Sequence, residues 1–383
     1  MKITEVKTYI VGNPWKNWLF VRLDTDEGLH GIGEATQNAF AKTIETAVHE
    51  LKIHYIGMDP FQIERIVQKM SRDVYSDGGQ LHMAAVAAIE VACWDVIGKF
   101  LNQPIYNLMG GRCHEKLKAY ANGWYQGART PEGFAQKAKE VVGRGYKALK
   151  FDPFGSAWRS MDPADEALSI DIVAAVREAV GPQVEILVEG HNRFSVAAAV
   201  RIGRLLEPFK PAWFEEPVHY GKISSIVEVA HKLSVPIACG ESLHSLHQFA
   251  ELLAYDAVHI LQPEIMSLGG LLNTKKVFSM ADAHYGVVAP HNAQGPISAA
   301  MCVQVAASTP NFLIQEMFDE FNVGWEEDLV THPIRVVDGF LTIPERPGLG
   351  LDLNFEELPK HPYQAQNFIP LFKPGWEFRQ GDR

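Results

Sequence analysis

The C-terminal two thirds of the chain repeat one pattern, in which a short apolar run ends in charged residues and an amphipathic stretch follows. Eight such runs come after residue 116: LKAYANG, YKALKFD, VEILVEGH, AWFEEP, PIACGE, AVHILQPE, GVVAPH and FLIQE. Short apolar runs that alternate with helical patterns indicate parallel βα units, and eight parallel strands can close into a barrel. The repeat therefore predicts an eight-stranded α/β barrel.

One helix between these runs carries clear end signals. Asp162 is a suitable N-cap and Pro163 suits the first helical turn. Apolar residues recur along the stretch that follows, and Gly181 with Pro182 closes it. We therefore expect a helix between Asp162 and Gly181.

Charged side chains fall at the last one or two positions of the runs. At intervals of 23 to 27 residues, about one βα unit, stand Glu189, Glu215, Glu241, Glu264, His291 and Glu316. Lys150 and Asp152 end the second run, and His191 follows Glu189 by two residues. Because catalytic groups of barrels converge at the C-terminal ends of the strands, we predict that these residues share one site.

Three of these carboxylates, Glu189, Glu215 and Glu241, end three consecutive strands. Carboxylates that converge without a cation repel and raise one another's pKa values, and a hard divalent ion removes that cost. Oxygen ligands with open positions are typical of Mg²⁺. We therefore predict a magnesium site here. The alternative is that each glutamate caps a helix or pairs with a basic side chain.

His291 ends the seventh run and Glu264 the sixth, so neighbouring strand ends bring them within hydrogen-bonding reach. A carboxylate that accepts a hydrogen bond from an imidazole fixes its tautomer and raises its basicity. We predict that His291 is a general base supported by Glu264. His191 shares a strand face with Glu189 and is a candidate general acid. A packing role is the alternative for either histidine.

Lys150 and Asp152 share a face at the end of the second run. We expect Lys150 to neutralise a substrate carboxylate or enolate, and Asp152 to accept hydrogen bonds from hydroxyls; packing or a salt bridge is the alternative. Glu316 is expected to carry a proton and donate it to a developing oxyanion. Together these groups suit removal of an α-proton from a metal-bound carboxylate, with His191 protonating a β-leaving group.

The first segment of the chain, before the barrel runs, has a different hydrophobic pattern. Alternation of polar and apolar residues from Met1 to about Ile32, broken by Asp and Gly, predicts antiparallel strands. Helical patterns follow from about Ala41 to Leu108. We expect an α+β domain over residues 1–116, a barrel domain over 117–320, and a C-terminal segment, 321–383, that packs back on the first domain.

Charge and hydropathy exclude two classes of partner. The chain has 46 Asp plus Glu against 35 Lys plus Arg, a net charge of −11, and no basic run. We therefore expect no nucleic-acid partner. The longest apolar stretch, His82 to Gly98, contains Glu90 and Asp95 and is too short to span a bilayer, so we expect no membrane partner. The N-terminus lacks a signal-peptide pattern, and a cytoplasmic location is predicted.

Motifs along nearly the whole chain resemble those of the enolase superfamily, in its mandelate-racemase-like subgroup. They are GLHGIGEA, AIEVACWDVIGKFLNQPIYNLMGG, KFD, EGHNRF, WFEEP, CGES, QPEIMSLGG, APHNAQGP and FLIQE. The resemblance implies a modified TIM barrel, (β/α)7β, with an N-terminal α+β capping domain. It also implies one Mg²⁺ per subunit, a Lys or His base, and a homo-oligomer between a dimer and an octamer.

By this resemblance, the metal-ligand positions fall on Glu189, Glu215 and Glu241, the base dyad on His291 and Glu264, and the electrophilic carboxyl on Glu316. Glu264 stands where relatives usually have Asp, so a longer side chain holds the imidazole. Asp152 stands where racemases and cycloisomerases carry a second lysine, which argues against racemisation with two bases.

The Glu189-Gly190-His191 pattern is similar to that of acid sugar dehydratases, especially gluconate and galactonate dehydratases. The resemblance implies that His291 removes the C2 proton of an aldonate-type sugar acid and that His191 protonates the departing 3-hydroxyl. The product would be a 2-keto-3-deoxy sugar acid. Substrate contacts are expected from two capping-domain loops, Asn13–Trp18 and Thr36–Phe40, through Trp15, Trp18, Gln37 and Asn38; a purely structural role is the alternative for each. The alternatives are an epimerase or cycloisomerase of the same superfamily, and a non-catalytic scaffold.

Overall fold

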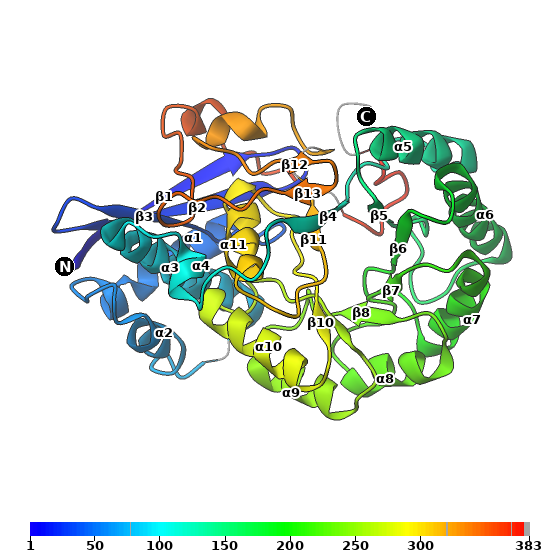
Figure 1. Cartoon of the computed structure of the whole chain (residues 1–383), viewed down its shortest axis with the longest axis horizontal. Coiled ribbons are helices and arrows are strands. Elements are labelled where there is room, and N and C mark those ends of the chain that lie inside the picture. Colours follow the sequence, from blue (N-terminus) through cyan, green and yellow to red (C-terminus); the bar gives the residue numbers. More distant parts are fainter. Residues whose placement is uncertain (77, 319–320, 369, 379–383) are drawn as a thin grey trace.

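The computed structural model describes residues 1–76, 78–318, 321–368 and 370–378. Figure 1 shows an α+β unit beside a barrel, with the C-terminal part of the chain running back over both. The predicted fold class, a modified TIM barrel with an N-terminal α+β unit, is confirmed.

The α+β unit, called the capping unit below, begins with an antiparallel sheet in the order β1 (Ile3–Gly12), β2 (Asn17–Thr25) and β3 (His30–Glu34). Four helices follow: α1 (Ala41–Tyr55), α2 (Ile63–Ser71), α3 (Gly79–Leu101) and α4 (Ile105–Leu108). The long apolar stretch forms the buried part of α3. In the described part of the chain, no helix has the length and hydropathy needed to cross a membrane.

All eight predicted runs form strands. They are β4 (Leu117–Ala121), β5 (Ala148–Phe151), β6 (Glu185–Glu189), β7 (Trp213–Glu215), β8 (Ile237–Cys239), β9 (Ile260–Leu261), β10 (Val287–Val288) and β11 (Gln315–Met317). Consecutive strands from β4 to β10 pair in parallel, and β11 pairs in parallel with β4. A single parallel bridge, Val288 to Phe312, joins the remaining gap. The barrel is therefore closed, with its weakest pairing before β11.

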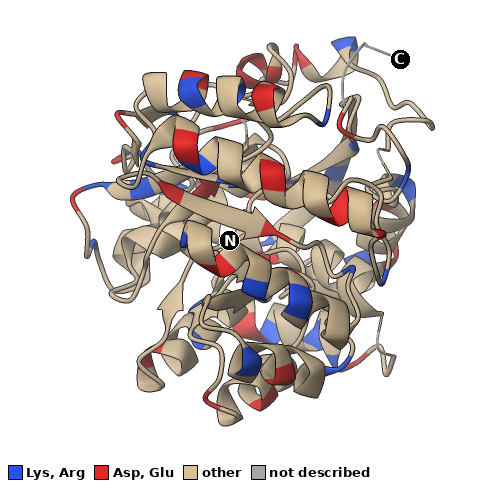
Figure 2. Ribbon diagram, turned by 90° about the vertical axis from the view of Figure 1, so that its right-hand side faces the viewer, with Lys and Arg blue, Asp and Glu red and all other residues tan. Residues whose placement is uncertain are grey.

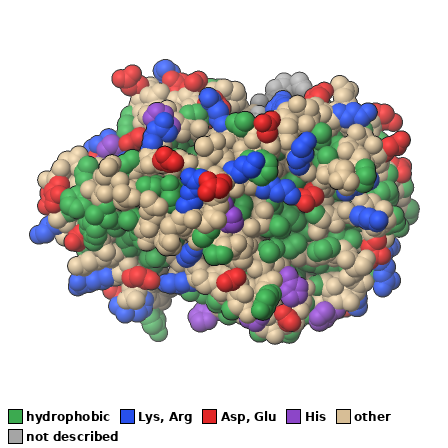
Figure 3. Space-filling model, viewed as in Figure 1, with side chains coloured by type: hydrophobic (Ala, Val, Ile, Leu, Met, Phe, Trp, Pro, Cys, Tyr) green, Lys and Arg blue, Asp and Glu red, His purple; other side chains and the backbone are tan. Residues whose placement is uncertain are grey.

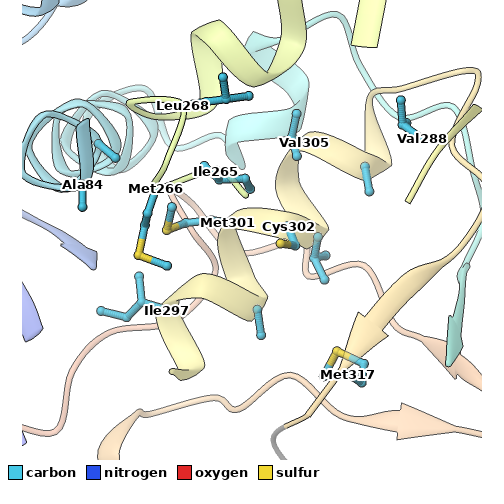
Figure 4. Close-up of a cluster of buried hydrophobic side chains, with 14 of the residues drawn as sticks. Ala84, Ile265, Met266, Leu268, Val288, Ile297, Met301, Cys302, Val305 and Met317 are labelled. Atoms are coloured by element: carbon cyan, nitrogen blue, oxygen red, sulfur yellow. The ribbon is translucent and has the colours of Figure 1, made fainter. Parts of the chain in front are cut away.

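Helices α5 (Pro131–Gly143), α6 (Pro163–Val180), α7 (Val196–Leu206), α8 (Ile223–Lys232), α9 (Leu246–Ala254), α10 (Leu271–Ala283) and α11 (Pro296–Ala307) connect the strands. The predicted helix between Asp162 and Gly181 is confirmed as α6. The Asp162 side chain caps it by accepting hydrogen bonds from the N–H groups of Ala164 and Asp165. Every residue of α11 is buried. Figure 4 shows its apolar side chains near Ala84 of α3, so one hydrophobic core spans the capping unit and the barrel.

Alternation along the strands separates the barrel interior into layers. An inner apolar cluster is formed by Tyr120, Ala148, Leu187, Trp213, Ala238, Ala289 and Ile314. Side chains two residues apart on a strand point to the same face. The next inward positions on four of these strands are Lys150, Glu189, Glu215 and Glu316. The polar groups therefore stand directly above a packed apolar floor at the C-terminal ends of the strands.

The chain after β11 contacts both units. It forms a hairpin of β12 (Val336–Val337) and β13 (Phe340–Leu341), and β13 pairs antiparallel with β4. The 3-10 helix η3 (Glu326–Leu329) precedes this hairpin, and the 3-10 helix η4 (Leu358–Lys360) follows it. Beyond η4, the N–H of Gly12 donates to the carbonyl of His361, and Asn17 exchanges hydrogen bonds with Gln364. The C-terminal segment therefore contacts both units along its length: Asn322 accepts a hydrogen bond from Asn13 before β13 pairs with β4, and the residues after η4 return to the capping sheet.

Buried carboxylates of the capping unit hold the N-termini of two barrel helices. Glu34 accepts hydrogen bonds from the N–H groups of Gly295 and Ser298 at the start of α11. Glu90 accepts from those of Leu271 and Leu272 at the start of α10. Anionic side chains are favourable at helix N-termini because they satisfy free N–H groups and oppose the helix dipole.

Charged residues outside these contacts are mixed in sign. Figure 2 shows acidic and basic residues interspersed along the helices, and Figure 3 shows both kinds side by side on the face in view. This mixing is typical of an ordinary hydrated protein surface.

Candidate active site

A cavity of about 660 Å³ opens at the C-terminal ends of the barrel strands. The barrel lines it with Lys150, His191, Glu241, Glu264 and His291, among others. The capping unit contributes Trp15, Lys16, Gln37, Asn38 and Gln80, and the C-terminal segment contributes Phe368, Leu371, Phe372 and Lys373. The cavity is therefore shared by the beginning, the middle and the end of the chain.

The three carboxylates predicted as metal ligands do meet. Glu189, Glu215 and Glu241 each offer one oxygen, and these oxygens lie within 4.8 Å of one another. The parallel register places Glu189 directly beside Glu215. The buried Glu189 Oε2 accepts no hydrogen bond, although Lys150 Nζ lies 3.2 Å away. Burial, and then the charge of Glu189, raise the pKa of Glu215 to about 8. An unsatisfied oxygen and mutual repulsion are what a bound divalent cation would relieve, so these residues fit a metal ion.

Lys150 supplies the positive charge at the bottom of the cavity. Its Nζ lies 2.5 Å from Glu215 Oε1, 2.9 Å from Glu316 Oε1 and 3.2 Å from Glu189 Oε2. Burial opposes the ammonium form, but Glu215 and Glu316 outweigh it and raise the pKa of Lys150.

The same ion pair corrects the prediction that Glu316 carries a proton. Burial alone would raise the pKa of Glu316, but the charges of Lys150 and His291 outweigh it and lower that pKa to about 2. Glu316 also accepts hydrogen bonds from the Asn122 side-chain amide and the Asn292 N–H. The predicted donor is therefore a carboxylate that accepts hydrogen bonds in this arrangement.

His291 and Glu264 form the predicted pair. The Nδ1 of His291 lies 2.7 Å from Glu264 Oε2, and its Nε2 lies 3.2 Å from Glu241 Oε2. Burial opposes the imidazolium, but Glu241 and then Glu316 and Glu264 raise the pKa of His291 to about 10. The extra methylene of Glu264 is accommodated, because its other oxygen accepts the N–H of Met266.

His191 is held from two sides. Its N–H donates to Glu189 Oε1 at 2.6 Å, and its Nδ1 lies 2.6 Å from Asp152 Oδ2. Its φ of 46° is in the left-handed region, which only a few per cent of non-glycine residues adopt, His more often than most. Such strain is found at functional sites, where neighbouring contacts maintain it. Burial opposes protonation of the ring, but Glu189 and Asp152 outweigh it and raise the pKa of His191.

Asp152 does not face the cavity, which corrects its predicted role toward substrate hydroxyls. It is fully buried, bonded to His191 Nδ1 and paired with the guanidinium of the buried Arg193. Arg193 also donates to the carbonyls of Gly190 and Gly155. Asp152 therefore orients His191 rather than touching a ligand.

Three of the four predicted capping-unit contacts line the cavity: Trp15, Gln37 and Asn38. The Trp15 ring stacks on Phe318 with centroids 4.2 Å apart, and Gln37 donates to the Ser267 hydroxyl. The prediction for Trp18 is wrong. Its side chain is fully buried, packs on Phe20 and Trp325, and is absent from the cavity wall. Both faces of β2 are buried where it begins, and Trp18 packs there against Trp325 of the C-terminal segment.

Sequence reasoning missed several lining residues. Lys16 lies between Trp15 and Trp18, in the first of the two loops from which substrate contacts are predicted. Gln294 follows His291 by three residues and holds Lys16. In the C-terminal segment, Trp376 donates to the Gly155 carbonyl, and its ring meets that of His191 edge to face at 6.3 Å. Its only signal was an aromatic-rich composition near the C-terminus.

A barrel that gathers three carboxylates below a carboxylate–imidazole pair, under an α+β cap, defines the enolase type of enzyme fold. The model of the mandelate racemase / muconate lactonizing enzyme N-terminal domain matches residues 7–110, and that of the enolase C-terminal domain-like family matches residues 133–358. The chain belongs to this mandelate racemase / muconate lactonizing enzyme family of the enolase superfamily, as the motifs predicted.

Two relatives with named activities are similar to this chain over 74% and 93% of their own lengths. A D-gluconate dehydratase of Thermoproteus tenax is 36% identical over 95% of this chain and 74% of its own length. A D-gluconate/D-galactonate dehydratase of Picrophilus torridus is 31% identical over 95% and 93%. A solved mandelate racemase/muconate lactonizing enzyme from Jannaschia sp. CCS1 superposes with a TM-score of 0.88 at 32% identity, over 95% of this chain and 98% of that one.

Proposed function

We propose that the protein is a magnesium-dependent acid sugar dehydratase, a hydro-lyase that converts an aldonate-type sugar acid into its 2-keto-3-deoxy acid. One observation carries the proposal. Two histidines, each held by a carboxylate, flank the cluster of Glu189, Glu215 and Glu241. They follow the third and seventh strands of an eight-stranded barrel, so they face each other across its mouth. Relatives named D-gluconate and D-galactonate dehydratase support the substrate class.

The proton transfers follow from the contacts of the two rings. Neutral His291 takes the C2 proton through Nε2, which faces the cavity while Nδ1 is held by Glu264. Protonated His191, held by Asp152, gives its proton to the 3-hydroxyl, so the C3–O bond breaks and water leaves. The resulting enol takes up a proton at C3 and becomes the keto acid. Removal of the C2 proton needs a base on one side of the substrate, and protonation of the leaving oxygen needs an acid on the other, which His291 and His191 would supply.

Glu189, Glu215 and Glu241 would hold the metal ion, which supplies positive charge next to the substrate carboxylate and its enediolate. Magnesium is proposed over softer metals because every candidate ligand is a carboxylate oxygen. Glu241 is the charge that raises the pKa of His291 most. Once a cation offsets that charge, His291 loses its proton more readily and suits the base role.

The structure gives little support to epimerisation. Lys150 is engaged by three carboxylates, and Asp152 is buried behind His191, so a second base facing C2 from the β5 side is absent among the described residues. The cytoplasmic location and the homo-oligomer remain predictions.

The proposal is tested by incubating the protein and Mg²⁺ with a library of sugar mono- and diacids and detecting α-keto acids with semicarbazide. We expect one group of acids to be dehydrated, with activity lost in EDTA and restored by Mg²⁺. Deuterium exchange at C2 with no loss of hydroxyl would instead favour an epimerase, and neither reaction with any acid would contradict the proposal.

A further inference from the structure

Lys16 is a buried cation whose known partners are both neutral. It lies in the loop between β1 and β2, is 5% exposed and lines the cavity. Its Nζ donates one hydrogen bond, 3.1 Å long, to Gln294 Oε1. The same Nζ lies 4.8 Å from the centre of the Trp15 ring.

An ammonium group carries three donors, and Lys16 uses one of them on a protein group. Within the described residues, no carboxylate lies within ion-pairing distance of its Nζ, whereas Lys150 contacts three. Burying a charge without a counter-charge is unfavourable. Accordingly burial lowers the pKa of Lys16 to about 8, with Glu264 and Glu241 opposing that shift from a distance. The amine remains mainly charged at neutral pH.

A lysine kept only for packing would place its ammonium group in water, because the long stem allows it. Lys16 does the opposite, since its charged end lies inside the cavity and its donors remain available there. The carboxylate cluster occupies the barrel end of the cavity, and Lys16 enters from the capping unit. A cavity of about 660 Å³ accommodates a six-carbon acid between them.

We propose that Lys16 binds a carboxylate of the substrate from the capping side. The inference rests on the proposed function and adds a specificity-determining residue to it. Two sources of that carboxylate are possible in chemical terms. A sugar diacid offers a second, terminal carboxylate, whereas a monoacid offers its single carboxylate to Lys16 and the metal site together.

The test compares wild type, Lys16→Gln and Lys16→Arg with D-gluconate and D-glucarate, which match in configuration and differ in the terminal group. Values of kcat and KM are measured separately with saturating Mg²⁺. We expect Lys16→Gln to raise KM at least tenfold with kcat changed less than threefold, and Lys16→Arg to recover part of the loss. If KM rises only for glucarate, Lys16 binds the terminal carboxylate of a diacid. If KM rises equally for both acids, Lys16 binds the carboxylate that is shared with the metal site.

Lys52→Gln is the matched control, because Lys52 is an exposed lysine of α1 in the same unit. Melting curves establish that the variants are folded. If a Lys16 variant folds poorly, the rise in melting temperature on adding each acid in EDTA is compared between wild type and Lys16→Arg. A KM within twofold of wild type for both acids in Lys16→Gln would overturn the inference. Absence of turnover of any acid by wild type would instead contradict the proposed function.

Discussion

Glu215 is the most constrained carboxylate of the cluster. One oxygen accepts from Lys150, and the other accepts from the Trp213 indole and the Gln262 amide. An amide in its place would keep the size of the side chain but remove its charge and direct an N–H group at one of these donors. The residue therefore links the packed floor of the barrel to the metal site.

Glu215→Gln is expected to abolish Mg²⁺ binding and lower kcat by at least about a thousandfold, since one charged ligand of three is lost. Calorimetry with Mg²⁺ and turnover of the identified acid measure the two effects. Glu185→Gln, at the exposed start of β6, is the control and should behave as wild type. Full turnover by Glu215→Gln would be incompatible with the metal assignment.

Isotope exchange distinguishes the role of His191 as an acid from the role of His291 as a base. His191→Asn removes the proton donor but leaves His291 and Glu264 in place, so elimination should fall by about a hundredfold or more. Exchange of the C2 proton with deuterated water should remain measurable by NMR. Elimination at the wild-type rate would remove His191 from the acid role.

The positions of the site residues were largely predictable, but their protonation and orientation were not. The interval of one βα unit placed Glu189, Glu215, Glu241, Glu264 and His291 together, because each ends a parallel strand. The states of Glu316 and Asp152 depend on Lys150 and Arg193, which approach from other strands and loops. Sequence spacing carries no information on such contacts.

Among the elements, the strands and helices of the barrel follow local patterns, whereas the C-terminal segment does not. End signals such as Asp162 and Gly181 are local, so α6 was predictable. The segment after β11 has short strands and turns whose partners, such as Gly12 and Asn17, lie more than 300 residues away. Its place in the cavity wall therefore emerges only from the folded chain.

Trp376 is the main anchor of that segment at the site. Trp376→Phe keeps an aromatic ring near His191 but loses the hydrogen bond to the Gly155 carbonyl, a bond worth about 1 kcal/mol. We expect kcat/KM to fall several-fold with a small drop in melting temperature. Trp376→Ala should lose at least tenfold in kcat/KM. Unchanged kinetics in the alanine variant would contradict a contribution of Trp376 to the site.

For the whole molecule, the buried carboxylates Glu34 and Glu90 fix the capping unit on the barrel. Glu90 is accommodated because Gly270, at a φ of 117°, has no Cβ to collide with it. The broad placement of a cap on a barrel followed from the family motifs. The contacts of Glu34 and Glu90 with the N-termini of α11 and α10 could not be predicted. An acidic residue in the sequence carries no sign of which distant helix its side chain will cap.

Glu90→Ala is expected to lower the free energy of unfolding by about 3 kcal/mol or more. The change leaves the N–H groups of Leu271 and Leu272 without their acceptor in a buried place, at about 1–3 kcal/mol each. Urea unfolding followed by circular dichroism measures the effect. Glu64→Ala is the control, because the exposed pair of Glu64 with Lys276 also joins the capping unit to α10 and is worth about 0–1 kcal/mol. Equal losses of unfolding free energy in Glu90→Ala and Glu64→Ala would contradict the stabilising role of Glu90.

Phe368, Leu371 and Phe372 line one side of the pocket, and they follow all eight barrel strands in the sequence, so a ribosome releases them after the strands. A nascent chain can complete all eight strands and assemble its carboxylates while one side of the pocket is still missing. A pocket closed off from bulk water is therefore completed later in synthesis than the barrel itself. Termination before Phe368 would leave the carboxylate cluster formed but one wall of its pocket absent.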